Sequence, residues 1–336
     1  MLISPPLRPI VETMQHLIPI ASGKGGVGKT LLAANLGIAL AQQGKTVVLV
    51  DLDLGGSNLH TLLGIRNSHP GIGHFIYKQA ETLEELLVET PQQRLFLIPG
   101  DGLFCGTANL PFHRKQAILK QLPEIPADFI ILDLGSGTTY NTLDLFLTSS
   151  AGLLVTSPDT TAILNAYSFL KSAMFRLLQR SFPAKSAERH LVLDFLQQKM
   201  EGSSLHIQEL VTRIRGIHPE SGDRARDALG QFRPRVVMNM GRTAQDIGLG
   251  GRLRKVVQDN LKSGIEFIAC LPQDEMASRS PLERSPTLLR YPECPYSRSI
   301  AHCAHRIIQE PAPPPAPLFE DDQDLQELAQ RFESLL

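Results

Sequence analysis

Short, continuously apolar stretches recur along the chain, and longer segments with apolar residues at helical spacing lie between them. Seven short stretches predict buried strands, at roughly 17–21, 46–51, 94–98, 129–133, 152–156, 235–240 and 266–271. The segment from Leu31 to Gln43 and the one that follows Ile163 predict helices. Because strands and helices alternate, the pattern predicts an α/β fold, with a mostly parallel, doubly wound sheet flanked by helices.

Four regions accompany this core in the predicted organisation. Residues 1–16 form an N-terminal extension, 17–309 the main domain, 310–319 a stiff proline-rich linker and 320–336 a C-terminal helix. Within the main domain, 181–232 predicts a helical insertion, interpreted as a solvated excursion, with a partner surface or a basic patch as alternatives. The insertion is marked by Leu191, Leu193, Phe195, Leu196, Arg213, Arg215, Arg224 and Arg226.

The C-terminal helix has one apolar stripe and an acidic remainder. The stripe comprises Leu325, Leu328, Ala329, Phe332, Leu335 and Leu336. Helices that bind anionic lipid usually carry lysine and arginine, whereas Arg331 is the lone basic residue of this segment. We therefore expect the helix to dock on its own domain or on a protein partner, with weak or transient membrane association.

Composition limits the possible classes of protein. The chain has 336 residues, a net charge of −1 and no apolar run of the ~20 residues that a membrane-spanning helix needs. Near-neutral charge gives no reason to expect specific nucleic-acid binding. The four cysteines, at 105, 270, 294 and 303, have no short paired spacing, which favours a reduced, cytoplasmic protein.

A glycine-rich loop follows the first predicted strand. Residues Gly23 to Thr30 match G-x-x-x-x-G-K-[ST] and precede a helix, which is the context of a phosphate-binding loop. Its backbone, formed by Gly23, Lys24, Gly25, Gly26, Val27, Gly28, Lys29 and Thr30, can direct N–H groups at phosphate oxygens. Lys29 would reach the β- and γ-phosphates of ATP, and the Thr30 hydroxyl would bind Mg²⁺.

Carboxylates follow two further predicted strands. Asp51 and Asp53 come at the end of one apolar run, and Asp133 ends another. Side chains at the carboxyl ends of parallel strands face the ligand crevice of such a sheet. An alternative for Asp51 and Asp53 is that they cap the next helix.

The second lysine of the loop makes the motif more specific. Lys24 directly follows Gly23, and the run KGGVGKT resembles the deviant phosphate loop of the MinD/ParA family of ATPases, whose fold is that of a SIMIBI-type P-loop NTPase. The resemblance implies that Lys24 contacts the phosphates bound by a second subunit, that Asp53 orients the attacking water, and that Asp51 and Asp133 support the Mg²⁺ shell. The segment after Asp51 is most similar to the flagellar number regulators of the FlhG type within this family.

The family resemblance also implies where the base binds. Asn239 would present an acceptor and a donor to the adenine edge, and the backbone from Pro272 to Asp274 would form the other wall. The alternative is that Asn239 is an asparagine with only a structural role in a turn.

The function implied is an ATP-hydrolysing switch that uses ATP and Mg²⁺, forms an ATP-dependent homodimer and acts on a regulatory or cargo protein. Its expected role is spatial placement of a cellular structure, the flagellum, from the cytoplasm or the inner face of the cell membrane. Alternatives are a ParA-like ATPase that partitions DNA or other cargo, an iron–sulfur carrier of the Mrp type, and a scaffold that does not hydrolyse ATP.

Overall fold

The computed structural model describes residues 17–100, 110–198, 207–310 and 322–335. The expected N-terminal extension 1–16, residues 311–319 of the linker, Cys105 and Leu336 lie outside these ranges.

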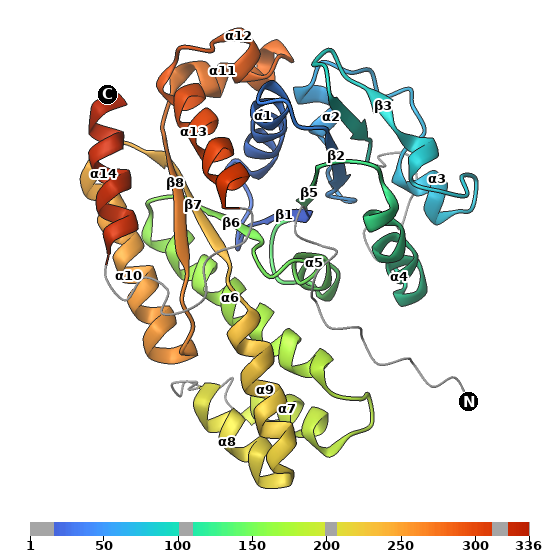
Figure 1. The fold of residues 1–336 in the computed structure, drawn as a ribbon, viewed down its shortest axis with the longest axis vertical. Helices are drawn as coiled ribbons and strands as arrows, with labels where there is room; N and C mark the ends of the chain where they lie inside the picture. Colours follow the sequence, from blue (N-terminus) through green and yellow to red (C-terminus); the bar gives the residue numbers. More distant parts are fainter. Residues whose placement is uncertain (1–16, 101–109, 199–206, 311–321, 336) are drawn as a thin grey trace.

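An eight-stranded sheet runs through the domain in the order β3-β4-β2-β5-β1-β6-β7-β8 (Figure 1). β3 pairs antiparallel with β4, and the other neighbours pair in parallel. The strands are β1 (Leu17–Ala21), β2 (Val47–Leu52), β3 (Val88–Glu89), β4 (Leu95–Ile98), β5 (Phe129–Leu134), β6 (Leu153–Thr156), β7 (Arg235–Gly241) and β8 (Glu266–Pro272). The expected fold class and its seven strands are confirmed. β3 was not expected, because two residues are too few to produce a recognisable pattern.

Each strand except β3 sends side chains to two hydrophobic clusters, one on each face of the sheet. In β5, Ile130 and Leu132 enter one cluster and Ile131 the other. The face that includes Ile131 is covered by α1 (Lys29–Gln42), α2 (Leu59–Leu62), α11 (Glu275–Glu283), α12 (Thr287–Arg290) and α13 (Pro295–Gln309). Continuous apolar runs are therefore buried on both sides, as parallel strands require.

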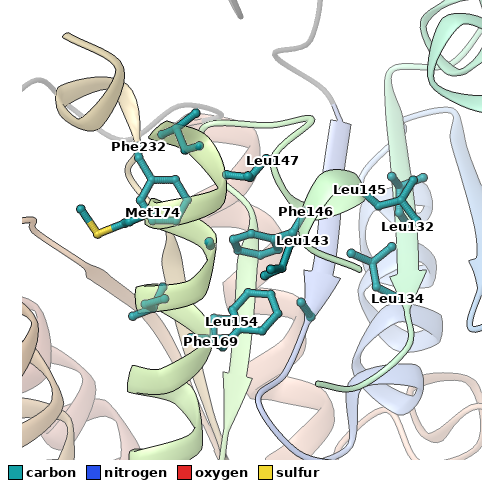
Figure 2. Packing of buried hydrophobic residues seen from close by; sticks show 14 of the residues in the cluster. Leu132, Leu134, Leu143, Leu145, Phe146, Leu147, Leu154, Phe169, Met174 and Phe232 are labelled. Carbon is teal, nitrogen blue, oxygen red and sulfur yellow. The ribbon is translucent and has the colours of Figure 1, made fainter. Parts of the chain in front are cut away.

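The opposite face carries the larger cluster. Its covering elements are α3 (Ile72–Ile76), η1 (Glu84–Leu86), α4 (Phe112–Gln121), η2 (Leu122–Glu124), α5 (Tyr140–Phe146), α6 (Thr160–Ser181), α10 (Ala244–Leu261) and α14 (Gln323–Leu335). Phe146 and Phe169 meet edge to face at its centre, with ring centroids 5.0 Å apart (Figure 2). Aromatic pairs of this geometry stabilise a core beyond the area that they bury.

The insertion forms α7 (Ala187–Gln198), α8 (Ile207–Ile217) and α9 (Pro219–Gln231), which make a lobe at the far end of α6 (Figure 1). The region is helical as expected, but it is not simply solvated. Val192, Phe195 and Leu210 are fully buried and continue the core under α6. The arginines lie on its outside, where Arg213 pairs with Glu209. Local pairing of this kind weakens the case for a basic patch.

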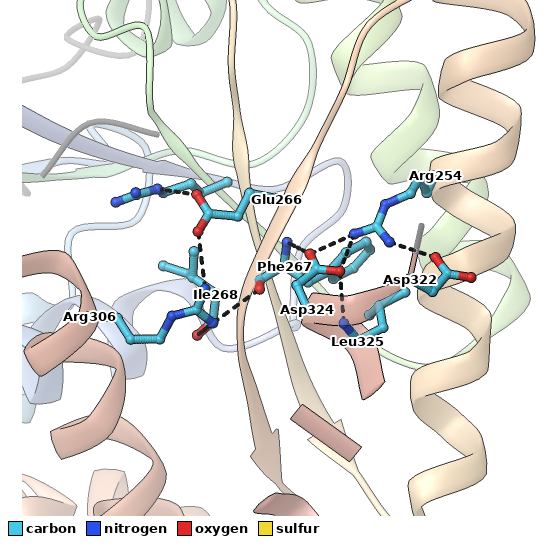
Figure 3. Close-up of polar contacts among 9 residues, drawn as sticks. Arg254, Glu266, Phe267, Ile268, Arg306, Asp322, Asp324 and Leu325 are labelled. Atoms are coloured by element: carbon cyan, nitrogen blue, oxygen red, sulfur yellow. Dashed lines mark hydrogen bonds and ion pairs between the residues drawn. The ribbon is translucent and has the colours of Figure 1, made fainter. Parts of the chain in front are cut away.

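α14 docks on its own domain, against α10 and β8. Leu325, Leu328 and Phe332 are buried there, and the Asp324 carboxylate accepts hydrogen bonds from both Arg254 and the Phe267 backbone N–H (Figure 3). Asp324 and Arg254 are 2–3% exposed. The apolar stripe of this helix therefore packs on the domain itself. Within the described ranges, no helix is long and apolar enough to cross a membrane.

A buried carboxylate ties α4, α5 and α6 together. Asp144 accepts hydrogen bonds from Lys115 of α4 and Arg176 of α6, and Arg180 lies 3.6 Å from it. Burial alone would raise the pKa of Asp144, but the hydrogen bonds from Arg176 and Lys115 hold it below its usual value. The charge of one buried carboxylate thus compensates three neighbouring cationic side chains.

Asp144→Asn should destabilise the protein by about 3–5 kcal/mol, because it leaves buried cations without a charged partner. Urea unfolding at neutral pH measures the change. The folded-state pKa of Asp144 is depressed, so its contribution is present above the unfolded pKa and disappears as pH falls through the folded value. The difference in the free energy of unfolding between wild type and Asp144→Asn should therefore become smaller at acidic pH. Glu209→Gln, at an exposed pair, is the control and should change stability by less than about 1 kcal/mol. A similar loss in both variants would contradict the assignment.

Candidate functional site

The sheet topology gathers the candidate residues at one edge. β1 lies between β5 and β6, and β2 lies on the other side of β5. Loops that leave the carboxyl ends of β1, β2 and β5 are therefore neighbours, although they are far apart in sequence. This edge is where ligands of open parallel sheets bind.

The loop from Ser22 to Gly28 is wedged between two other segments. A β-carbon at Gly23 would lie 2.1 Å from the carbonyl oxygen of Asn165 in α6. At Gly28, which has φ 89°, it would lie 2.3 Å from Nδ2 of Asn239. Distances this short exclude any side chain. The glycines therefore permit the loop to curl where its neighbours leave no room.

The loop opens into the N-terminus of α1. Gly28 gives no side-chain cap to this helix, and its first turn has no acidic residue. The free N–H groups and the positive end of the helix dipole together favour an anion. Lys29 is 7% exposed at the first position of α1, and Thr30 follows it. The structure thus places both expected phosphate and metal contacts at the anion-binding end.

Asp51 and Asp133 are register partners on neighbouring strands. Both are buried, at 0% and 1% exposure. Neither oxygen of Asp133 has a hydrogen-bond partner among the described residues. Burial and the adjacent Asp51 raise the pKa of Asp133 to about 8, although the charge of Lys29 acts in the opposite direction. A buried, unpartnered carboxylate beside a second one is a donor set that suits Mg²⁺, so the residues present fit this ion.

Asp51 is already bonded within the chain. Its carboxylate accepts hydrogen bonds from the Ser57 hydroxyl at 2.6 Å and from the Leu59 N–H at 3.1 Å. Burial raises the pKa of Asp51 to about 6. Asp51 thereby fixes the loop that contains Asp53, and it holds the first N–H of α2, as the helix-capping alternative predicted for this residue.

Asp53 faces the loop after β5. A β-carbon at Gly135 would lie 3.3 Å from Oδ1 of Asp53. In the same loop, the Gly137 N–H donates to the carbonyl of Ser22, at 3.0 Å. The structure therefore brings Asp53, the loop after Asp133 and the phosphate loop together.

Lys24 is bonded at the start of α6 in its own chain. Its ammonium lies 3.2 Å from Oδ1 of Asp159 and 3.2 Å from the Thr161 hydroxyl. Hydroxyl donation by Ser157 and Thr161 holds the pKa of Asp159 well below its usual value. Lys24 keeps 34% of its side chain exposed. The predicted partner of Lys24 is a phosphate of another subunit, and Asp159 is its partner here.

A cavity of about 460 Å³ opens beside the ends of β7 and β8. Its lining comprises Gly241, Arg242, Gln273, Asp274, Glu275 and Ser278. The Asp274 side chain caps α11 by accepting from the Met276 N–H, and Pro272 pairs with Gly241 across the strands. Gln273 and Asp274 of the expected base wall thus border this open cavity.

Asn239 lies beneath the phosphate loop and does not line that cavity. It is 2% exposed, donates to the Val27 carbonyl at 2.8 Å and accepts from the Met240 N–H at 3.0 Å. In this arrangement its amide anchors the loop. Contact with an adenine edge stays a prediction.

Several site residues had no recognisable sequence signal. Arg242 belongs to none of the motifs, and its side chain is hydrogen-bonded at 2.7 Å to that of Gln273, a residue whose backbone alone was expected at the base wall. Asp159 could have been found, because aspartate before Thr-Thr at a helix start is a typical N-cap.

Comparison with known proteins decides the family. The profile of the CobQ/CobB/MinD/ParA nucleotide-binding domain matches residues 18–288. The chain belongs to this family. Among curated relatives, it is 35% identical over 161 residues to the flagellum site-determining protein YlxH of Helicobacter pylori, covering 46% of this chain and 52% of that protein. The septum site-determining protein MinD of Thermotoga maritima is 31% identical over 160 residues, 46% of this chain and 56% of MinD. The chain thus spans about half the length of the curated relatives that it matches.

Solved structures of the family share the fold over more of the chain. MinD of Pyrococcus horikoshii, complexed with Mg-ADP, has a TM-score of 0.59 at 20% identity and covers 87% of this chain and 95% of its own. A ParA family ATPase of Chlorobium tepidum has a TM-score of 0.58 at 20% identity, covering 87% of this chain and 99% of its own. At such identities the likeness concerns the fold.

The Asp51–Asp133 pair should make stability depend on pH when nucleotide and Mg²⁺ are removed. With its folded pKa raised to about 8, Asp133 binds more protons in the native state than unfolded, so stability falls as pH rises between about 4 and 8. Asp133→Asn removes this cost, and at pH 8 the variant should be at least about 1 kcal/mol more stable than wild type.

Unfolding in EDTA at pH 5 and pH 8 measures this difference. Asp227→Asn, which removes an exposed carboxylate, is the control for a general charge effect. A gap between wild type and Asp133→Asn that is equal at both pH values would contradict the argument.

Proposed function

We propose that the chain is an ATPase of the MinD/ParA type, which dimerises around ATP and Mg²⁺, separates after hydrolysis and thereby controls the placement of a cellular structure. The observation that carries the proposal is the side-by-side Asp51 and Asp133 next to a glycine loop that opens a helix N-terminus. A phosphate cradle and a metal-binding carboxylate pair at one sheet edge are the two parts that nucleotide hydrolysis needs.

Each residue has a role in this proposal. Lys29 and the loop N–H groups would bind the β- and γ-phosphates. Thr30, Asp51 and Asp133 would hold Mg²⁺, which would neutralise charge on the phosphates when bound. Asp53 orients the attacking water. Its position against Gly135 supports this role, because the loop after β5 can then respond to the same phosphate.

Lys24 supports dimerisation. A lysine that contacts only the phosphates bound by its own chain can be fully buried. Lys24 is instead partly exposed and is bonded to Asp159 at the surface. An ammonium that is held near the site by a carboxylate can exchange that partner for a phosphate of a second subunit. Dimer formation would then depend on bound ATP.

The cargo is inferred from the relatives. The flagellum site-determining protein of H. pylori and the MinD proteins are named for placing a structure in the cell, and MinD of Aquifex aeolicus has been solved with MinC. We infer a role in flagellar placement, with a regulatory protein as partner. We infer that the protein acts in the cytoplasm, and that any association with the membrane is made by the dimer.

Asp53→Ala should bind ATP and accumulate as a dimer, with hydrolysis slowed about 100-fold, because water orientation is lost while the cradle remains. Phosphate release and size-exclusion chromatography with light scattering, both with ATP and Mg²⁺, measure the two effects. A variant that turns over ATP at the wild-type rate would contradict the role of Asp53.

Lys24→Ala should bind ATP yet stay monomeric in the same chromatography, because its proposed contact lies across the interface. Lys45→Ala, which removes a half-buried lysine beyond the far end of α1, is the matched control and should dimerise normally. ATP-dependent dimers of unchanged stability in Lys24→Ala would remove the cross-subunit role. Absence of ATP binding by wild type would overturn the proposed function as a whole.

A further inference from the structure

The end of β7 connects the phosphate loop with the C-terminal helix. Asn239 donates to the loop at Val27, Met240 follows with φ 63°, and Gly241 is next. A positive φ is unusual for methionine and marks backbone that its surroundings hold in place. The pairing of β7 with β8 is irregular between Met238 and Gly241. This segment is therefore a local departure from regular strand at the edge of the site.

Gly241 lies next to both the cavity and the C-terminal helix. It lines the 460 Å³ cavity together with Arg242 and Gln273. A β-carbon at Gly241 would lie 3.1 Å from Cε2 of Phe332 and 3.2 Å from Sγ of Cys270. The backbone of Gly241 thus connects the cavity with the aromatic ring of α14.

The Phe332 side chain is tightly packed. It is 1% exposed and shares its surroundings with Leu328, His302 and Cys270, where only about 10 Å³ of space remains. α14 is in turn fixed at its start by Asp324, which accepts from Arg254 at 2.6 Å. A well-packed ring has little freedom to move, so it can hold the backbone that rests on it.

The cavity side of this wall depends on few other contacts. Arg242 donates from its backbone N–H to Asp246 at 2.8 Å and from its side chain to Gln273 at 2.7 Å, and the Gln273 N–H donates to the Gly241 carbonyl at 2.7 Å. Arg242 itself is exposed. The wall is thus a thin layer with Phe332 behind it.

We propose that Phe332 is a positioning residue for the nucleotide base: by packing behind Gly241 it supports the cavity wall, so that docking of α14 and binding of nucleotide strengthen each other. This rests on the proposed function and on the predicted base wall from Pro272 to Asp274, which together would place the base of ATP or ADP at the cavity. Reciprocity follows because two events that favour the same wall conformation are thermodynamically linked.

Titration of the full-length chain with Mg-ADP tests the proposal. Phe332→Ala should raise the Kd about five- to tenfold, and Phe332→Leu by less. Leu325→Ala is the matched control, since Leu325 is buried on the same helix but faces Gly250. It should change the Kd less than twofold while lowering thermal stability, as Phe332→Ala also does. Tripolyphosphate, which has no base, should bind wild type and Phe332→Ala with equal affinity.

Hydrogen exchange on the wild-type chain provides a readout that needs no variant. Saturating Mg-ADP should slow amide exchange in α14. Unchanged exchange there, an unchanged Kd for Phe332→Ala, equal losses in Leu325→Ala and Phe332→Ala, or an equal loss of tripolyphosphate binding would each overturn the inference. Failure of wild type to bind Mg-ADP would instead overturn the proposed function.

Discussion

A β-carbon at position 23 would lie 2.1 Å from the backbone of α6, and one at position 28 would lie 2.3 Å from a side chain of β7. The phosphate loop is therefore held from two sides by segments that come much later in the sequence. This contact places Lys24 at the start of α6, where Asp159 receives it, and places Asn239 under the loop. The same wedging fixes the direction of α1, and with it the anion-binding end of that helix.

Features that repeat along one strand or one loop could be predicted from the sequence. The buried strands were found because parallel strands are apolar on both faces, and the acids at their ends could be placed at the ligand edge by topology alone. The sequence could not predict that Asp51 and Asp133 are register partners, because the register depends on how β2 and β5 pack against each other. The use of Asn239 as an anchor and the existence of the cavity likewise depend on contacts between distant segments.

The C-terminal helix shows the same limit. Its charges favoured docking on a protein surface, yet they left open whether the occupied groove belongs to this chain or to a partner. The answer rests on Arg254 and Asp324, which are 70 positions apart and meet in the buried space beside β8. Neither residue stands in a pattern that predicts the pair. A buried ion pair thus joins the apolar stripe in fixing where this amphipathic helix docks.

The two charged side chains beside β8 also bear on how the protein associates. Among the residues that the structure describes, β8 is the last strand of the sheet, and one of its edges has no neighbouring strand. Asp324 accepts from its Phe267 N–H, while Arg306 donates to the carbonyls of Phe267 and Ile268 (Figure 3). Side chains therefore occupy backbone groups that an incoming strand would need, and α13 and α14 shield them. Extension of the sheet from one molecule into the next is blocked at this edge, which protects the chain from edge-to-edge aggregation and directs self-association to other surfaces.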